Sequence, residues 1–220
     1  MAQEKLVIAV LGGTGKEGPG LAMRWAHAGY KVIIGSRKAE KAEATATELN
    51  KNLGIDTITG LANEDAARVA DISVLTVVAT AHQPAVTGLK DALKGKIMVD
   101  ATARVDFRDP KPPAAPAAAI TAQEILGPDV RVVAAYQNVP AHTLKHNLGG
   151  KIATDVMICA DDVSAAEQVM ALTEAAGMQA YYAGSLANAL TVEGLTAILI
   201  SMNKYYKVKT ASIQVSGLSL

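Results

Sequence analysis

Short apolar runs and longer amphipathic stretches take turns along this 220-residue chain. Runs rich in Val, Ile and Leu predict strands that are buried on both faces, as in parallel sheets. Such runs occupy residues 7–11, 31–35, 57–60, 72–77, 96–100, 130–136, 155–160 and 178–182. Helical spacing of apolar residues predicts helices over residues 21–28, 39–53, 63–70, 85–93, 164–176 and 186–205, the third with Asn63 as its N-cap. This alternation of strand and helix favours a doubly wound α/β sheet.

Three segments in the second half of the chain need separate interpretation. Residues 101–119 are rich in Ala and Pro, and proline removes amide donors, so we expect a surface crossover or a lid. The tail 211–215 alternates apolar and polar residues, as an edge strand does. The apolar residues of 186–205 cover a wide arc, which implies burial against the sheet or against a second subunit.

A glycine pattern follows the first predicted strand. Gly13, Gly15 and Gly18 form Gly-x-Gly-x-x-Gly between an apolar run and a helix-like stretch. In this context a dinucleotide pyrophosphate lies on the amides at a helix N-terminus. We expect Gly13 to allow the tight turn, Gly15 to let the backbone approach phosphate, and Gly18 to let helix and strand pack closely.

The end of the second predicted strand indicates which dinucleotide is bound. NAD-binding units usually place Asp or Glu there, to hold the ribose 2′-hydroxyl. This chain instead carries Ser36 and Arg37, a hydroxyl and a planar guanidinium that suit a 2′-phosphate, and Lys38 or Lys41 adds charge. The alternative is a solvated basic start to the next helix. We therefore expect NADP rather than NAD.

These patterns together predict a Rossmann-like, mostly parallel sheet with a small C-terminal α/β extension. We expect residues 1–135 to form the NADP-binding domain and residues 136–220 to form a C-terminal α/β region.

Composition narrows the classes of function. The formal net charge is zero, which gives no electrostatic case for binding nucleic acid or an anionic membrane. Cys159 is the single cysteine, so an internal disulfide and a thiolate metal cluster are excluded, and its apolar neighbours predict burial. We expect no signal peptide and no apolar run near the ~20 residues of a membrane span. We expect a cytoplasmic protein without a metal.

The predicted strand ends carry little acid–base chemistry. Residues 77–80, 101–103 and 137–140 are small, apolar or neutral. Reduction of a carbonyl usually needs a positioned acid, whereas hydride exchange between two flat rings needs stacking and exclusion of water. The alternative is a catalytic acid that the pattern does not reveal. His82 either borders the nicotinamide or begins a helix. The polarity of Glu193 among apolar neighbours predicts a fixed hydrogen-bonding role, for which locking the helix to the sheet is the alternative to a role in the site.

The order of several motifs resembles a known family. After the glycine turn and residues 35–37 come Gln137-Asn138-Val139-Pro140-Ala141, Ala183-Gly184-Ser185-Leu186-Ala187-Asn188-Ala189 and Asn203-Lys204-Tyr205-Tyr206-Lys207. Together they resemble the NADPH-dependent coenzyme F(420) reductases over essentially the whole chain. The resemblance implies direct hydride transfer between NADPH and a deazaflavin. It also implies a homodimer formed through the C-terminal part, which makes residues 136–220 a substrate and dimerisation region.

The resemblance also implies roles for individual residues. In the pyrophosphate site they are Thr14, Gly15, Lys16 and Glu17. In the 2′-phosphate site they are Ser36, Arg37 and Lys41. Beside the adenosine or the nicotinamide ribose they are Val77, Ala79 and Ala101. Flanking the stack of nicotinamide and deazaflavin they are Gln137 and Val139.

The chain departs from the family pattern on the substrate side. Gln137 stands where archaeal members are expected to carry His, Ser185 replaces a Pro, and Leu190 stands where some members carry Arg. The loop 109–119 differs as well. Two alternatives therefore stay open: an NADPH-dependent reductase of a free flavin, ferric chelate, imine or carbonyl, and a non-catalytic NADP(H) sensor.

Overall fold

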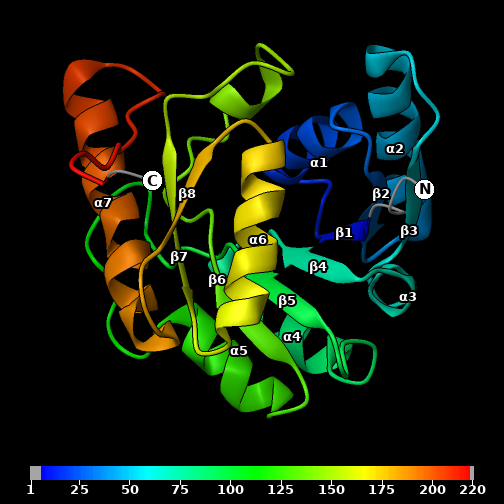
Figure 1. The fold of residues 1–220 in the computed structure, drawn as a ribbon, viewed down its shortest axis with the longest axis horizontal. Coiled ribbons are helices and arrows are strands. Elements are labelled where there is room, and N and C mark those ends of the chain that lie inside the picture. The colour runs from blue at the N-terminus through cyan, green and yellow to red at the C-terminus, as the bar shows by residue number, and fades with distance from the viewer. Residues whose placement is uncertain (1–5, 219–220) are drawn as a thin grey trace.

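Eight strands form one sheet in the computed structural model, which describes residues 6–218 (Figure 1). They are β1 (Val7–Leu11), β2 (Lys31–Ser36), β3 (Ile58–Ala62), β4 (Ile72–Leu75), β5 (Ile97–Asp100), β6 (Arg131–Ala134), β7 (Asp155–Ala160) and β8 (Gln179–Tyr182). Their order is β3-β2-β1-β4-β5-β6-β7-β8, and every neighbouring pair is parallel except β6 and β7. The predicted doubly wound, mostly parallel α/β fold is confirmed.

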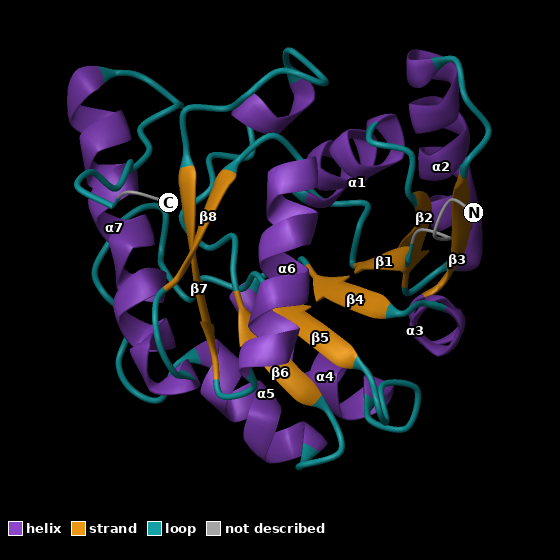
Figure 2. Ribbon diagram, viewed as in Figure 1, coloured by secondary structure: helices purple, strands orange, loops and turns teal. Residues whose placement is uncertain are grey.

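Helices cover both faces of the sheet (Figure 2). They are α1 (Gly18–His27), α2 (Ala39–Leu53), α3 (Asn63–Val69), α4 (His82–Leu89), α5 (Ala118–Leu126), α6 (Val163–Ala175) and α7 (Ala189–Tyr206). The cores show that α1, α2 and α6 pack on one face, and α3, α4, α5 and α7 on the other. Short 3-10 turns occur at η1 (Ala79–Ala81), η2 (Thr143–Lys145) and η3 (Leu186–Asn188).

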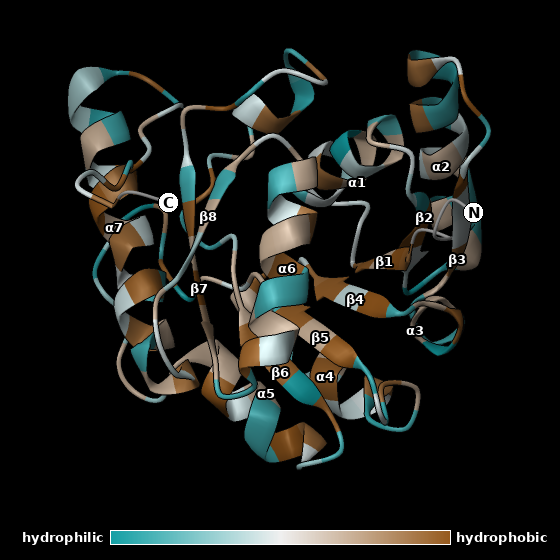
Figure 3. Cartoon of the chain, viewed as in Figure 1, coloured by the Kyte–Doolittle hydropathy of each residue, from teal (hydrophilic) through white to brown (hydrophobic). Residues whose placement is uncertain are grey.

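The core is continuous across the expected boundary at residue 135, and in Figure 3 the inner strands are largely hydrophobic. Trp25 of α1 is fully buried and donates its indole N–H to the carbonyl of Leu172 in α6, at 2.9 Å. Its ring meets the edge of Tyr136, which follows β6, with centroids 6.0 Å apart. A buried aromatic pair of this kind stabilises the fold beyond the area that its rings bury.

Two segments differ from the sequence prediction. The helix α5 lies where the prediction had the end of the Ala/Pro segment and no element, because prolines upstream hid an alanine-rich stretch of high helix propensity. The tail 211–215 is not a strand. It runs beside the start of β7 instead, where the amide of Asp155 donates to the carbonyl of Ile213.

The N-cap prediction is also wrong. Asn63 is the first residue of α3 rather than its cap, and Ala62 precedes the helix without a side-chain capping bond. The amide oxygen of Asn63 instead accepts a hydrogen bond from the Gly12 amide, at 3.0 Å. The Asn63 side chain therefore satisfies a backbone amide of the glycine turn rather than an amide of its own helix.

Of two predictions from apolar runs, one is confirmed and one is wrong. Cys159 is fully buried, as expected, and burial raises the pKa of its thiol to about 11. The expectation that no apolar run approaches the length of a membrane span is wrong for Leu186–Tyr206, which passes that test by length and composition alone. The same segment carries Glu193, whose side chain is buried against the protein and ion-paired.

The sheet topology defines one crevice. β1 lies between β2 and β4, so the chain crosses from one half of the sheet to the other at the carboxyl ends of β1 and β4. Ligands of open parallel sheets bind at such a switch point. Since β7 runs antiparallel to β6, the amino ends of β7 and β8 lie at this same edge.

Candidate active site

The glycine turn after β1 is shaped by close backbone packing. Gly12 has φ of 72°, a conformation that glycine adopts without strain, so the positive φ lies one residue before the expected Gly13. A Cβ at Gly13 would lie 2.5 Å from the Val10 carbonyl oxygen, and one at Gly18 would lie 2.6 Å from the Cα of Gly13. Gly18 therefore allows helix α1 to approach the turn, as the sequence predicted.

Three strand ends meet at this turn. The amide of Gly13 donates to the carbonyl of Gly35, at 2.9 Å, which ties the turn to the end of β2. A Cβ at Gly12 would lie 2.6 Å from Val77 Cγ1, beyond β4. At Gly15 the nearest atom to an added Cβ is 3.7 Å away, so the backbone here is open to a ligand. Thr14 is half-buried beside it.

Lys16 and Glu17, at the end of the turn, differ in their exposure to solvent. Lys16 is exposed, whereas Glu17 is half-buried and its Oε1 atom has no hydrogen-bond partner among the described residues. Burial raises the pKa of Glu17 from 4.5 to about 8, so the carboxyl is mostly protonated at pH 7. A neutral acid does not repel an anionic group bound at the same helix N-terminus.

The end of β2 presents a hydroxyl and free cations. Ser36 is 6% exposed, and its Oγ accepts a long 3.4 Å hydrogen bond from the Lys38 amide. The guanidinium of Arg37 is exposed and makes no hydrogen bond or ion pair within residues 6–218. Lys41 lies exposed in the first turn of α2, whose N-cap supplies no side-chain bond. These groups can receive a dianion beside a helix N-terminus.

The other predicted residues lie at the ends of β4, β5 and β6. Val77 is half-buried and Ala79 is exposed in η1, whereas Ala101, Gln137 and Val139 are buried, at 5%, 7% and 8% exposed. Their side chains are short or apolar apart from Gln137. These five residues thus offer uncharged surfaces that suit flat rings.

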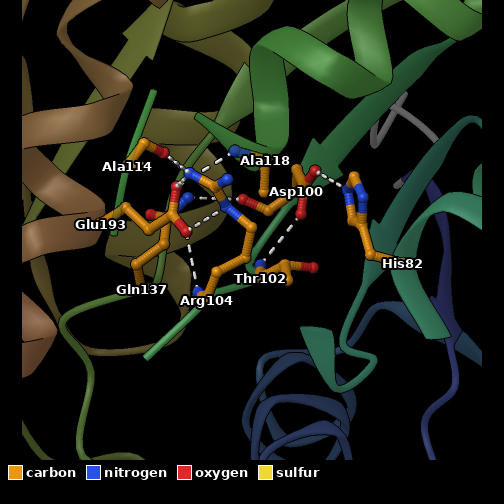
Figure 4. A network of polar contacts seen from close by, with 8 residues as sticks. All are labelled: His82, Asp100, Thr102, Arg104, Ala114, Ala118, Gln137 and Glu193. Carbon is orange, nitrogen blue, oxygen red and sulfur yellow. Dashed lines mark hydrogen bonds and ion pairs between the residues drawn. The ribbon is translucent and has the colours of Figure 1, made fainter. Parts of the chain in front are cut away.

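A buried histidine–aspartate pair lies at the end of β5 (Figure 4). His82 begins α4, as one of the two sequence interpretations had it, and its Nε2 lies 2.6 Å from Asp100 Oδ2. Both residues are buried, and the other carboxylate oxygen of Asp100 accepts from the Thr102 amide, at 2.9 Å. Sequence reasoning missed Asp100, because its partner lies 18 residues away on another element.

Gln137 is held at both its side chain and its main chain. Its Nε2 donates to the carbonyl of Asp100, at 2.8 Å, and its own carbonyl accepts from the Thr196 hydroxyl, at 2.7 Å. The Oε1 of Gln137 and the Oγ1 of Thr102 are buried without partners among the described atoms. Buried oxygens of this kind are usually satisfied by a ligand or by water.

Glu193 of α7 is the most heavily bonded carboxylate at this end of the sheet (Figure 4). It forms an ion pair with Arg104, 2.8 Å from Nε, although the two residues are 89 positions apart. The fixed hydrogen-bonding role expected for Glu193 is therefore confirmed, while sequence reasoning missed Arg104. Within residues 6–218, no group of three or more His, Cys, Asp or Glu side chains is placed to hold a metal ion.

The sheet order and the glycine turn define a Rossmann-type dinucleotide-binding protein. The family model "NADP oxidoreductase coenzyme F(420)-dependent" matches residues 7–104. The F(420)-dependent NADP reductase of Methanothermobacter thermautotrophicus is 36% identical, over 96% of this chain and 95% of the relative. That of Methanocaldococcus jannaschii is 37% identical, over 97% of this chain and 99% of the relative. The chain belongs to the F(420)-dependent NADP reductase family.

A solved structure shows the same fold. The crystal structure of a candidate F(420)-dependent NADP reductase from Arthrobacter sp. FB24 covers 97% of this chain and 100% of its own, with a TM-score of 0.80 and 24% identity.

Proposed function

We propose that this protein transfers hydride between NADPH and the deazaflavin coenzyme F(420). The relatives that carry this activity in their names align over nearly the whole chain, including the acceptor side. The observation that carries the choice of dinucleotide is the end of β2, where a buried hydroxyl and an exposed guanidinium replace the usual acid.

The dinucleotide fits the turn and the strand ends as the resemblance implies. The turn residues that would hold the pyrophosphate are Gly13, Thr14, Gly15, Lys16, Glu17 and Gly18. Ser36, Arg37 and Lys41 would hold the 2′-phosphate, since a hydroxyl, a planar guanidinium and an ammonium group suit a dianion. Val77, Ala79 and Ala101 would flank the adenosine or the nicotinamide ribose.

The residues around the reacting rings bind, orient and exclude water. When bound, NADPH supplies the hydride and the deazaflavin ring accepts it. Gln137 and Val139 flank the stacked rings, and both are buried. Because Gln137 is held by Asp100 and Thr196, its side chain presents one fixed surface to the rings. A fixed, dry stacking surface lowers the barrier through orientation rather than through proton transfer.

We further propose a functional division of the chain and its assembly state. Residues 1–135 bind NADP, and residues 136–220 form the substrate and dimerisation region, a division supported by the reversal of strand direction between β6 and β7. The protein acts in the cytoplasm as a homodimer. The partially exposed apolar residues Ile198 and Met202 of α7 support the dimer, because such surface is commonly covered by a second subunit.

The proposal is tested by mixing the purified protein with oxidised F(420) and NADPH and following the visible absorbance of the deazaflavin. We expect the absorbance to bleach with turnover, and NADH to support much less of it. NADPH oxidation with free flavin or a ferric chelate, and none with F(420), would identify another acceptor. Tight NADP(H) binding without turnover of any acceptor would identify a sensor, and either result contradicts the proposal.

A further inference from the structure

One buried carboxylate closes the loop between β5 and α5. Glu193 is 1% exposed, and its Oε1 accepts from both the main-chain amide and Nε of Arg104, each at 2.8 Å. Its Oε2 accepts from Arg104 Nη2 and from the Ala118 amide, each at 3.1 Å. The two ends of the segment 105–117, which we name the strap, are thus joined at one side chain of α7.

Glu193 also completes the helix that follows the strap. Ala118 is the first residue of α5, and the preceding Ala117 provides no side-chain cap. The first amides of a helix lack intrahelical partners and favour a negative charge. Glu193, which belongs to a different helix, supplies both the acceptor and the negative charge at this N-terminus. Because Glu193 is 1% exposed, protein donors rather than water satisfy its two carboxylate oxygens.

The strap runs beside α7 beyond this point. Arg104 Nη2 also donates to the Ala114 carbonyl, at 2.9 Å, within the strap. Lys204 Nζ donates to the Arg108 carbonyl, at 2.7 Å, three turns further along the helix. An added Cβ on Gly194 would lie 3.6 Å from Pro112 Cβ. Contacts at both ends and along the length hold the strap against one helix.

The same face of α7 reaches the proposed hydride-transfer site. Thr196 follows Glu193 by three residues, so the two side chains lie on one side of the helix. Thr196 holds the Gln137 carbonyl, and the Gln137 side chain is bonded to the Asp100 carbonyl, at the end of the strand from which the strap departs. Figure 4 shows the Glu193 and Asp100 contacts lying next to one another around Gln137.

We propose that Glu193 is a positioning residue that, through Arg104 and the strap, sets the geometry of the acceptor side of the hydride-transfer site. The proposal rests on the function proposed above. It assigns to Glu193 no contact with the reacting atoms. Its effect is on how closely the deazaflavin ring approaches the nicotinamide, while the dinucleotide turn and the end of β2 lie outside the network.

The first test compares the unaltered protein with Glu193→Gln. Glutamine keeps the shape but places an N–H opposite groups that already donate, so at least one end of the strap loses its acceptor. We expect the KM for F(420) to rise about tenfold or more, the KM for NADPH to stay within about twofold, and the deuterium isotope effect with 4-deuterated NADPH to increase. Glu167→Gln, the same change at an exposed site of α6, is the matched control.

Amide hydrogen exchange supplies an independent measure of the strap. We expect faster exchange over residues 104–118 in Glu193→Gln and unchanged exchange in the glycine turn. Arg104→Lys is the second variant if Glu193→Gln does not fold, because it keeps the charge and the main-chain bonds while losing the guanidinium fork. We expect the same direction of change in KM and exchange, at smaller size.

The outcomes separate the two proposals. Normal turnover by the unaltered protein, with unchanged F(420) KM and isotope effect in both variants, overturns the role of Glu193 and leaves the proposed function standing. A drop in kcat alone, with unchanged KM, isotope effect and exchange, indicates loss of folded protein and also overturns it. No turnover by the unaltered protein overturns the proposed function, and unchanged exchange over 104–118 then overturns the strap separately.

Discussion

Replacing Glu17 by Gln should make the protein more stable at alkaline pH. The Glu17 carboxyl lies at the start of α1 with a buried, unpartnered Oε1, and burial raises its pKa from 4.5 to about 8. Ionising this group in the folded protein costs free energy that glutamine, which carries no charge, does not cost.

The sign follows from proton counts in the two states. Between pH 4.5 and 8 the folded protein keeps the Glu17 proton and the unfolded chain has lost it, so the free energy of unfolding falls as pH rises. At about 1.4 kcal/mol per pH unit, the full window corresponds to about 5 kcal/mol. Because the residue as a whole is only half-buried, water screens part of this cost, and we expect about 2–4 kcal/mol.

The assay is urea denaturation of both proteins at pH 5, 6, 7, 8 and 9. We expect near-equal stability at pH 5 and a difference that grows in favour of Glu17→Gln up to about pH 8.5. Glu48→Gln, at an exposed position of α2, is the control and should show no such pH-dependent difference. A difference between Glu17→Gln and the unaltered protein that stays constant across this range would refute the reasoning.

Three further substitutions test other parts of the structure. Arg37→Glu should weaken NADPH binding by about 2–4 kcal/mol and NADH binding much less, measured by calorimetry; equal losses would rule out the 2′-phosphate assignment. Arg24→Met should lower the free energy of unfolding by about 3–5 kcal/mol in urea, because the buried guanidinium bonds the carbonyls of Leu144, His146, Asn147, Gly150 and Ala176, and a loss below about 1 kcal/mol would contradict this role. Gly18→Ala puts a Cβ 2.6 Å from the Gly13 Cα, so we expect at least a tenfold weaker affinity for NADPH by fluorescence titration, and an unchanged affinity would show that the turn adapts.

The strands and most helices could be predicted because each carries its own apolar signal. The predicted bounds of every strand from β1 to β8 lie within two residues of the observed bounds. The helix α5 was missed since its stretch of alanines follows several prolines, and its N-terminus depends on Glu193 rather than on a local cap. Tertiary contacts, which the local pattern does not contain, decide such ends.

The candidate site also contains residues that the sequence reveals and residues that only the fold brings together. The glycine turn and the end of β2 are local motifs, so their residues could be named from spacing alone. The pairs His82–Asp100 and Arg104–Glu193 could not be, because each joins elements that only the fold brings together. At Asn63 the local preference and the tertiary contact differ. Its residue type favours a helix N-cap, but in the folded chain its side chain accepts a hydrogen bond from the Gly12 amide.

The long helix α7 has two sides with different tasks. One side bears Glu193 and Thr196, and the other leaves Ile198, Met202 and Tyr205 at 52%, 41% and 81% exposure. A molecule that covers the apolar side would restrain the helix that carries Glu193 and Thr196, so under the proposed dimer and the proposed role of Glu193 its binding and turnover would be linked equilibria. In a dimer built on this helix, specific activity would fall on dilution in parallel with dissociation. This would hold even if neither subunit contributes a side chain to the active site of the other.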